Sequence, residues 1–225
     1  MDIRYDLIST GSEGNAVVVN DFILIDCGIT FKALKDYYKA LKIVLLTHIH
    51  GDHFNKTCIR LLARERPTLR FVCCGWLAES LVDCKVEKSN IDIVEFNKRY
   101  LYGLCDIIPL PLVHDVPNCG YKVYFPAGNS YHKMIYATDT NCLNGISAKH
   151  FDLYMIEANH TEEEIKQKIA DKKADGEYAY EKRAMQYHLS KDKADDFIYR
   201  NIGPNGEYVY LHCHKDKEID LCSIK

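Results

Sequence analysis

The segment Ile43-Val44-Leu45-Leu46-Thr47-His48-Ile49-His50-Gly51-Asp52-His53 decides the fold of this chain. Its first four residues are apolar and partly β-branched, which is typical of a buried strand. Directly after that strand come three imidazoles and a carboxylate. Four ligand-type side chains in six positions cannot all reach one ion comfortably, so the spacing favours two sub-sites. His48 and His50 would bind at one of them, and Asp52 and His53 at the other.

A polar loop in which histidines gather without a cation is the alternative interpretation of this segment. It is disfavoured because so many ligand side chains at a strand end are costly to assemble unless a cation satisfies them. Gly51 is expected to let the backbone turn tightly between the two sub-sites. The sequence therefore predicts a metal-binding loop.

The bulk composition indicates one globular domain, residues 1–225. A chain of 225 residues with 47% hydrophobic content can bury a sizeable core. The sequence shows no linker, low-complexity tract or internal repeat. No apolar run approaches the roughly 18 residues of a membrane span, so we expect no membrane partner and no export.

The cysteines and the net charge indicate the cellular compartment and the kind of partner. The ten cysteines form no C-x-x-C pair and stand mostly in apolar contexts, which favours a reducing compartment and hence the cytoplasm. The formal net charge of −3 gives no indication of a basic surface. A protein that wraps duplex DNA over a large face would usually have one.

Apolar runs and helical periodicity predict an alternation of strands and helices. Strands are expected at residues 2–8, 16–20, 22–25, 43–46, 70–73, 91–96, 104–112, 121–125, 132–137, 151–156 and 208–211. Helices are expected at residues 31–41, 57–64, 76–82, 162–193 with an interruption near Asp175-Gly176, and 195–199. Trp76 could stack on a base, but among leucines it is interpreted as a core residue.

The pattern His-x-His-x-Asp-His after an apolar strand and Thr47 resembles the signature of the metallo-β-lactamase superfamily. The resemblance implies an α/β fold, a four-layer αβ/βα sandwich with a dinuclear metal site at the sheet edges. It also implies that the carboxylate of Asp26 lies behind the ligands and orients one of them. His114, at the end of a later strand, would be the next ligand of the first metal, the alternative being a satisfied loop histidine.

Asp139 follows the predicted hairpin and has the chemistry of a bridging ligand. A carboxylate has two oxygens and can hold two cations at roughly 3.5–4 Å, which suits phosphoryl chemistry. A cysteine there would resemble secreted lactamases. His50, where di-iron oxidoreductases of the superfamily carry a glutamate, likewise disfavours redox chemistry. Hydrolysis with two metal ions fits better.

A longer series of motifs resembles the YycJ (WalJ)-like branch, an exonuclease-type relative of tRNA 3′-processing ribonucleases. In chain order the motifs are Gly11-Ser12-x-Gly14-Asn15-Ala16, Asp26-x-Gly28, the His48 segment, His114-Asp115, Thr138-Asp139-Thr140, Glu157-Ala158-Asn159-His160, His188-Leu189-Ser190 with Ala194, and His212-x-His214. The resemblance covers nearly the whole chain.

This resemblance implies a role for each matched residue. His48, His50 and His114 would bind one metal, Asp52, His53 and His212 the other, and Asp139 would bridge them. His188 would assist near the scissile phosphate as a proton donor or charge stabiliser, without binding metal. The tail departs from the family pattern, so the last ligand is His212 or His214, with alignment favouring His212. The role of His160 is left open.

The expected chemistry is attack on a phosphodiester by a hydroxide formed between two divalent ions, with Asp52 orienting the nucleophile. Zinc is favoured by ligand type, and manganese is the alternative. The leading hypothesis is an exonuclease-like nuclease acting on DNA or RNA ends. A cyclic nucleotide phosphodiesterase that degrades a signalling or phage-defence nucleotide is the alternative. A non-catalytic, metal-stabilised interaction protein is a third hypothesis. Small members of this fold often form homodimers, so a homodimer is a further expectation.

Overall fold

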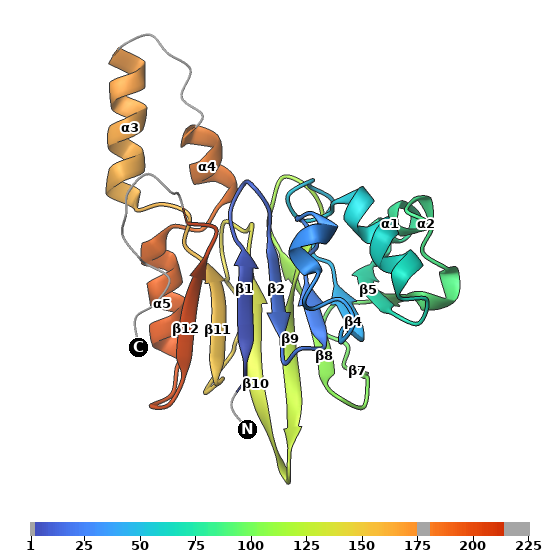
Figure 1. The fold of residues 1–225 in the computed structure, drawn as a ribbon. Coiled ribbons are helices and arrows are strands. Elements are labelled where there is room, and N and C mark those ends of the chain that lie inside the picture. Colours follow the sequence, from blue (N-terminus) through green and yellow to red (C-terminus); the bar gives the residue numbers. More distant parts are fainter. Residues whose placement is uncertain (1–2, 175–180, 214–225) are drawn as a thin grey trace. The chain divides into compact units, whose positions relative to one another are not determined.

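The structure is a computed structural model that describes residues 3–174 and 181–213. Its chain divides into two compact units, Met1–Tyr100 and Leu101–Lys225. Each unit is built on one six-stranded sheet (Figure 1). The expectation of a single domain over residues 1–225 stays a prediction.

The first unit carries its strands in chain order across the sheet. They are β1 (Tyr5–Ser9), β2 (Ala16–Val19), β3 (Ile23–Ile25), β4 (Ile43–Leu45), β5 (Arg70–Cys74) and β6 (Ile91–Val94). β2 runs antiparallel to β1 and β3, whereas β3 to β6 are parallel. The helices are α1 (Lys56–Glu65) and α2 (Ala78–Asp83), with the 3₁₀ turns η1 (Phe31–Leu34), η2 (Gly75–Leu77) and η3 (Lys88–Asn90). The carboxyl ends of β3 and β4 therefore meet the amino end of β2 at one sheet edge.

Burial explains why these segments take their forms. All three residues of β4 are buried between β3 and β5, as expected for a parallel strand in the middle of a sheet. α1 begins where the side chain of Asn55 accepts a hydrogen bond from the amide of Cys58. Its buried residues Cys58, Ile59 and Leu62 recur at helical spacing and join the core of this unit.

The second unit carries its strands in the order β12-β11-β10-β9-β8-β7. They are β7 (Tyr100–Leu101), β8 (Asp106–Leu112), β9 (Asn118–Ala127), β10 (Ser130–Ala137), β11 (Leu153–Glu157) and β12 (Glu207–Leu211). β10, β11 and β12 are parallel, and β9 is antiparallel to both β8 and β10. One edge of this sheet thus gathers the carboxyl ends of β8, β10, β11 and β12.

The helices of the second unit follow β11 in the chain. They are α3 (Glu162–Ala174), α4 (Glu181–Tyr187) and α5 (Lys191–Asn201). Ser190 caps α5 by accepting a hydrogen bond from the amide of Lys193. Ala194, Phe197 and Ile198 of α5 then pack into the core of this unit.

Several sequence-based expectations differ from the structure. Residues 31–41 form the short 3₁₀ turn η1 followed by further turns in place of a helix. These turns are enough to bury Leu34 and Leu41. The stretch 162–193 is interrupted at residues 188–190. The interruption expected near Asp175-Gly176 lies outside the described residues. Trp76 is 37% exposed and packs on the ring of Phe96, so its interpretation as a core residue was wrong. The strand β7 was not predicted.

The expected α/β class is confirmed, with the strands gathered in two sheets and accompanied by helices. Among the described helices, none is long and apolar enough to span a bilayer.

Candidate metal centre

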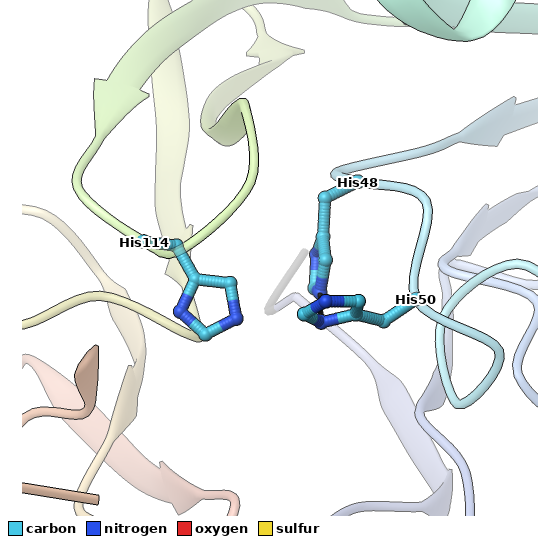
Figure 2. A group of neighbouring side chains, drawn as sticks. All are labelled: His48, His50 and His114. Carbon is cyan, nitrogen blue, oxygen red and sulfur yellow. Dashed lines mark hydrogen bonds between the residues drawn. The ribbon is translucent and has the colours of Figure 1, made fainter. Parts of the chain in front are cut away.

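The loop after β4 carries four of the predicted ligands of the first unit. Figure 2 shows His48 and His50 extending from this loop. His48 Nε2 lies 3.2 Å from His50 Nδ1. The ring of His48 also packs on that of His53, with centroids 4.2 Å apart. Two ring nitrogens at this separation either share a proton or face a common cation, so the pair has the geometry of a cation-binding sub-site.

Asp26 lies behind these histidines. Its Oδ2 accepts a hydrogen bond of 2.7 Å from Nδ1 of His53, and both side chains are fully buried. Its Oδ1 accepts from the amide and the hydroxyl of Thr47, at 3.0 and 2.9 Å. A proton held on Nδ1 leaves the lone pair of His53 on Nε2, the nitrogen a metal would use. Asp26 therefore has contacts that fit the predicted orienting role.

Asp52 is held by its backbone as well as by its side chain. The Asp52 carbonyl accepts from the amide of Asn15 at 2.6 Å, and Asn15 Nδ2 lies 2.8 Å from His53 Nε2. A Cβ atom on Gly28 would meet the Asp52 carbonyl oxygen at 1.6 Å, so only glycine permits this close approach. By contrast, a Cβ on Gly51 would meet nothing within 4 Å, so the tight turn expected there does not depend on glycine.

The sheet edge of the second unit gathers a second group of donors. Ligand atoms of Asp139, Glu157, His188 and His212 all lie within 4.8 Å of one another. Asp139 Oδ1 is 3.4 Å from His188 Nδ1 and 3.6 Å from His212 Nε2. The rings of His188 and His212 are stacked, with an interplanar angle of 13°. This edge therefore brings together two predicted ligands and the predicted proton donor.

Glu157 was named in a sequence motif but not among the site residues. It is fully buried, and its Oε1 accepts a 2.6 Å hydrogen bond from His188 Nδ1. Its Oε2 accepts from the amides of Thr140 and Leu189, at 2.9 and 3.2 Å. The signal in the sequence was a carboxylate at the end of an otherwise apolar buried strand, β11.

His114 follows β8, as Figure 2 shows, and is oriented from within its own unit. Its Nδ1 donates to the carbonyl of Tyr187 at 3.2 Å, and its Nε2 lies 3.2 Å from Asp115 Oδ1. Asp115 in turn pairs with Arg183 of α4. Burial lowers the pKa of His114, an effect that the neighbouring Asp139 and Asp115 carboxylates oppose. A neutral imidazole is the form that binds a metal.

His212 is held by Asn159, which also lies beside His160. Asn159 Nδ2 lies 3.0 Å from His212 Nδ1 and donates to the His212 carbonyl at 3.2 Å. His160 Nδ1 is 3.3 Å from Asn159 Oδ1, and His160 belongs to none of the candidate metal-binding groups found in the described chain. His214 lies outside the described residues.

The donor set fits divalent transition metals. Imidazole nitrogens and carboxylate oxygens are the ligands that zinc, manganese and iron accept in proteins. In the second unit, three of the four grouped residues are buried, and the carboxylate oxygens lie beside imidazole nitrogens. Buried carboxylates at this density need protons or cations to balance them, so the residues present fit a metal site.

Comparisons with known proteins agree with this fold. The chain shows structural similarity to the metallo-beta-lactamase fold protein YhfI from Bacillus subtilis, with a TM-score of 0.72 and 17% identity over 97% of this chain and 89% of that one. Human tRNase Z, short form, gives a TM-score of 0.64 and 16% identity over 93% and 92% of the two chains. The diiron beta-hydroxylase CmlA from Streptomyces venezuelae gives 0.58 and 13%, over 94% of this chain and 44% of that one.

No curated protein matches the chain in sequence. At identities this low, the structural similarities show the fold alone. The family model described as a beta-lactamase superfamily domain, however, matches residues 22–194, which is most of the chain. This superfamily includes metal-dependent hydrolases. From the extent of that match and the two-sheet fold, we conclude that this chain belongs to the beta-lactamase superfamily.

Proposed function

We propose that this chain is a dinuclear metal-dependent phosphodiesterase of the YycJ (WalJ)-like branch, acting as an exonuclease-like nuclease on DNA or RNA ends. The proposal gives one ion to His48, His50 and His114, the other to Asp52, His53 and His212, and both to Asp139. When bound, the two ions would lower the pKa of a water molecule and neutralise charge on the phosphate. Zinc is the proposed metal, with manganese as the alternative.

The observation that carries the proposal is the hydrogen bond between His188 and Glu157. Because Glu157 Oε1 accepts from Nδ1, the second nitrogen of His188 is the one that can carry a proton to a leaving oxygen. The buried carboxylate also fixes the orientation of the His188 ring. His188 lies beside Asp139. In this proposal it binds no metal, so its second nitrogen is available to donate a proton.

Asp52 supports the chemistry in a second way. Its side chain is a quarter exposed, whereas the neighbouring His53 is fully buried. Its Oδ2 lies 3.6 Å from His53 Nε2, so the carboxylate is close to the atom proposed to bind metal. An accessible carboxylate there can accept a hydrogen bond from the attacking water and orient it.

The choice of substrate rests on similarity to a nuclease. Human tRNase Z shares the fold over most of both chains. Nine cysteines of the described chain are free thiols, which supports action in a reducing cytoplasm, where such polymers are processed.

The test is metal analysis combined with turnover of end-labelled DNA or RNA. Two metals per chain and stepwise release of mononucleotides from polymer ends, weakening steeply as salt is raised, are the expected results. Two bound metals with no cleavage of the polymers or of bis-p-nitrophenyl phosphate would contradict the proposal and favour a metal-stabilised interaction protein.

A cyclic nucleotide phosphodiesterase is the second candidate, and charge is the observation that favours it. The net charge is −3, and Lys166 and Lys172 of the α3–α4 region each pair with a glutamate, at 3.0 and 2.7 Å. The charge of each of these lysines is therefore offset by a glutamate of the chain. A surface that binds a nucleic-acid polymer would instead present cations to the phosphates. Selective opening of a cyclic nucleotide, with weak salt dependence and a homodimer in solution, would support this candidate over the exonuclease.

A further inference from the structure

Three of the candidate site residues have backbone conformations that L-amino acids rarely adopt. Asp26, Asp139 and His212 have φ angles of 59°, 52° and 53°. Each such conformation is strained and persists only when the surroundings of the residue hold it. Since the proposed role of each residue requires its carboxylate or imidazole, glycine cannot relieve the strain at these positions. Other contacts must therefore hold the backbone.

At Asp139 those contacts come from Asn118. The side-chain amide of Asn118 donates to the carbonyl of Thr138 at 3.0 Å and to the carbonyl of Asp139 at 2.6 Å. An amide nitrogen carries two hydrogens, so both are used on the two peptide groups that flank the left-handed residue. A rotation about φ or ψ of Asp139 would break at least one of the two bonds.

The sheet register explains why Asn118 reaches these atoms. β9 and β10 are antiparallel, and Tyr121 is paired with Tyr136. Extending that register places Asn118, the first residue of β9, opposite Asp139, just beyond the last residue of β10. A Cβ on Gly120 would meet the Tyr136 carbonyl oxygen at 2.6 Å, so glycine also lets the two strands approach closely at this end.

The side-chain oxygen of Asn118 shows that the amide donors are what this residue contributes. Asn118 is 2% exposed, and its Oδ1 has no hydrogen-bond partner in the described part of the chain. Burying an unsatisfied amide oxygen is unfavourable, and an apolar residue would avoid that cost. The two N–H donors are therefore the contribution of this side chain.

From these contacts we propose that Asn118 is a positioning residue for Asp139, holding the carboxylate in the orientation that binds metal. The inference rests on the proposed role of Asp139 as a bridging ligand. Asn118 touches neither substrate nor metal and acts through the Asp139 backbone. Loss of such a supporting hydrogen bond typically weakens metal binding about 10–100-fold.

Two variants of the full-length chain test the proposal. Asn118→Ala removes both donors, and Asn118→Asp keeps the shape but replaces the donors with a carboxylate. Asn201→Ala is the matched control, because Asn201 is also buried and makes two side-chain hydrogen bonds, to Ala148 and Phe197, neither of which is a proposed ligand. Zinc affinity is measured by competition with a chelator, the visible spectrum of the Co²⁺-loaded protein reports the ligand geometry, and thermal unfolding of the metal-free protein reports the fold.

The expected result is a loss of zinc affinity of about 10–100-fold and an altered Co²⁺ spectrum for both Asn118 variants, with wild-type affinity and spectrum for Asn201→Ala. If Asn118→Asp fails to fold, Asn118→Ala decides. Wild-type affinity in Asn118→Ala, or an equal loss in Asn201→Ala, would overturn the positioning role while leaving the phosphodiesterase proposal standing. A wild-type chain that binds no divalent metal would overturn both.

Discussion

Glu157 divides its two oxygens between a side chain and the backbone. Oε1 accepts from His188, and Oε2 accepts from the amides of Thr140 and Leu189. Three donors on this fully buried carboxylate fix its plane. The imidazole of His188 is thereby held in one orientation, with its second nitrogen available for proton transfer.

This arrangement predicts that removing His188 affects rate and not metal content. His188→Ala should lower kcat for phosphodiester cleavage by about 10²–10⁴-fold, the usual contribution of a positioned proton donor. Metal content, measured by elemental mass spectrometry, should stay at the wild-type level. Glu157→Gln should slow the same step, and the double variant should be little slower than His188→Ala because the two residues act as a unit.

Loss of metal from His188→Ala would show that the imidazole is a ligand and that the role assigned to it is wrong. Asp139→Ala is the matched comparison, because Asp139 lies 3.4 Å from His188 and is the proposed bridging ligand. That variant should lose metal.

Two glycines near the first group of ligands give a prediction about stability. Gly28→Ala would drive a Cβ into the backbone oxygen of Asp52, which cannot move aside as a flexible side chain would. The free energy of unfolding should fall by about 3 kcal/mol, the upper end of overpacking effects. Gly51→Ala, which meets nothing within 4 Å, should change it by no more than about 0.5 kcal/mol. Urea denaturation of the two variants makes the comparison, and equal effects would contradict it.

At the scale of elements, α4 is connected to the loop that carries His114. The last residue of α4, Tyr187, accepts the hydrogen bond from His114 Nδ1, and Arg183 pairs with Asp115. Asn141 Nδ2 adds a hydrogen bond of 3.0 Å to the carbonyl of Gln186. The carboxyl end of α4 therefore determines which nitrogen of His114 is protonated.

Removing the ion pair of α4 should loosen the helix with little cost in stability. The side chain of Arg183 is 68% exposed, so Arg183→Ala should change the free energy of unfolding by less than about 1 kcal/mol. Hydrogen exchange of the α4 amides should nevertheless accelerate. Arg200→Ala is the matched control, because Arg200 is 73% exposed and pairs within α5 with Asp196. Unchanged exchange in α4, or equal acceleration in both helices, would rule out this connection.

At the scale of the whole molecule, two buried thiols report on the two units separately. Cys73 lies in the first unit and Cys105 in the second, and burial raises the pKa of each to about 12. Both should resist alkylation in the native protein. If residues 1–225 form one domain, pulsed alkylation across a urea gradient should give both thiols the same midpoint. Two separate midpoints would show that the units unfold independently.

The same thiols predict how stability depends on pH. Each keeps its proton when folded, whereas the unfolded chain loses it near the ordinary pKa of 9.0. The unfolded state therefore binds fewer protons above that pH, and stability, complete below it, falls as pH rises towards 12. Urea unfolding of the wild-type chain at neutral pH and at about pH 10 should show the loss, and Cys105→Ala should reduce it.

Much of the fold could be predicted because its signals are local. The apolar run ending at Leu46 and the alternation of strands and helices indicate parallel strands whose ends carry polar residues. Residues 31–41 were predicted as one helix because their apolar residues recur at helical spacing, yet consecutive turns bury Leu34 and Leu41 equally well. The exposure of Trp76 was also beyond prediction, since it depends on which elements cover η2 and β6.

The sequence by itself determined the superfamily and placed the candidate metal-binding side chains at strand ends, because these follow from residue chemistry and from periodicity along one segment. The tertiary structure decided what supports those side chains. Glu157 with His188, Asn118 with Asp139 and Tyr187 with His114 each join residues from different elements. Such pairings depend on strand register and helix placement, which arise only when segments distant in the chain pack together.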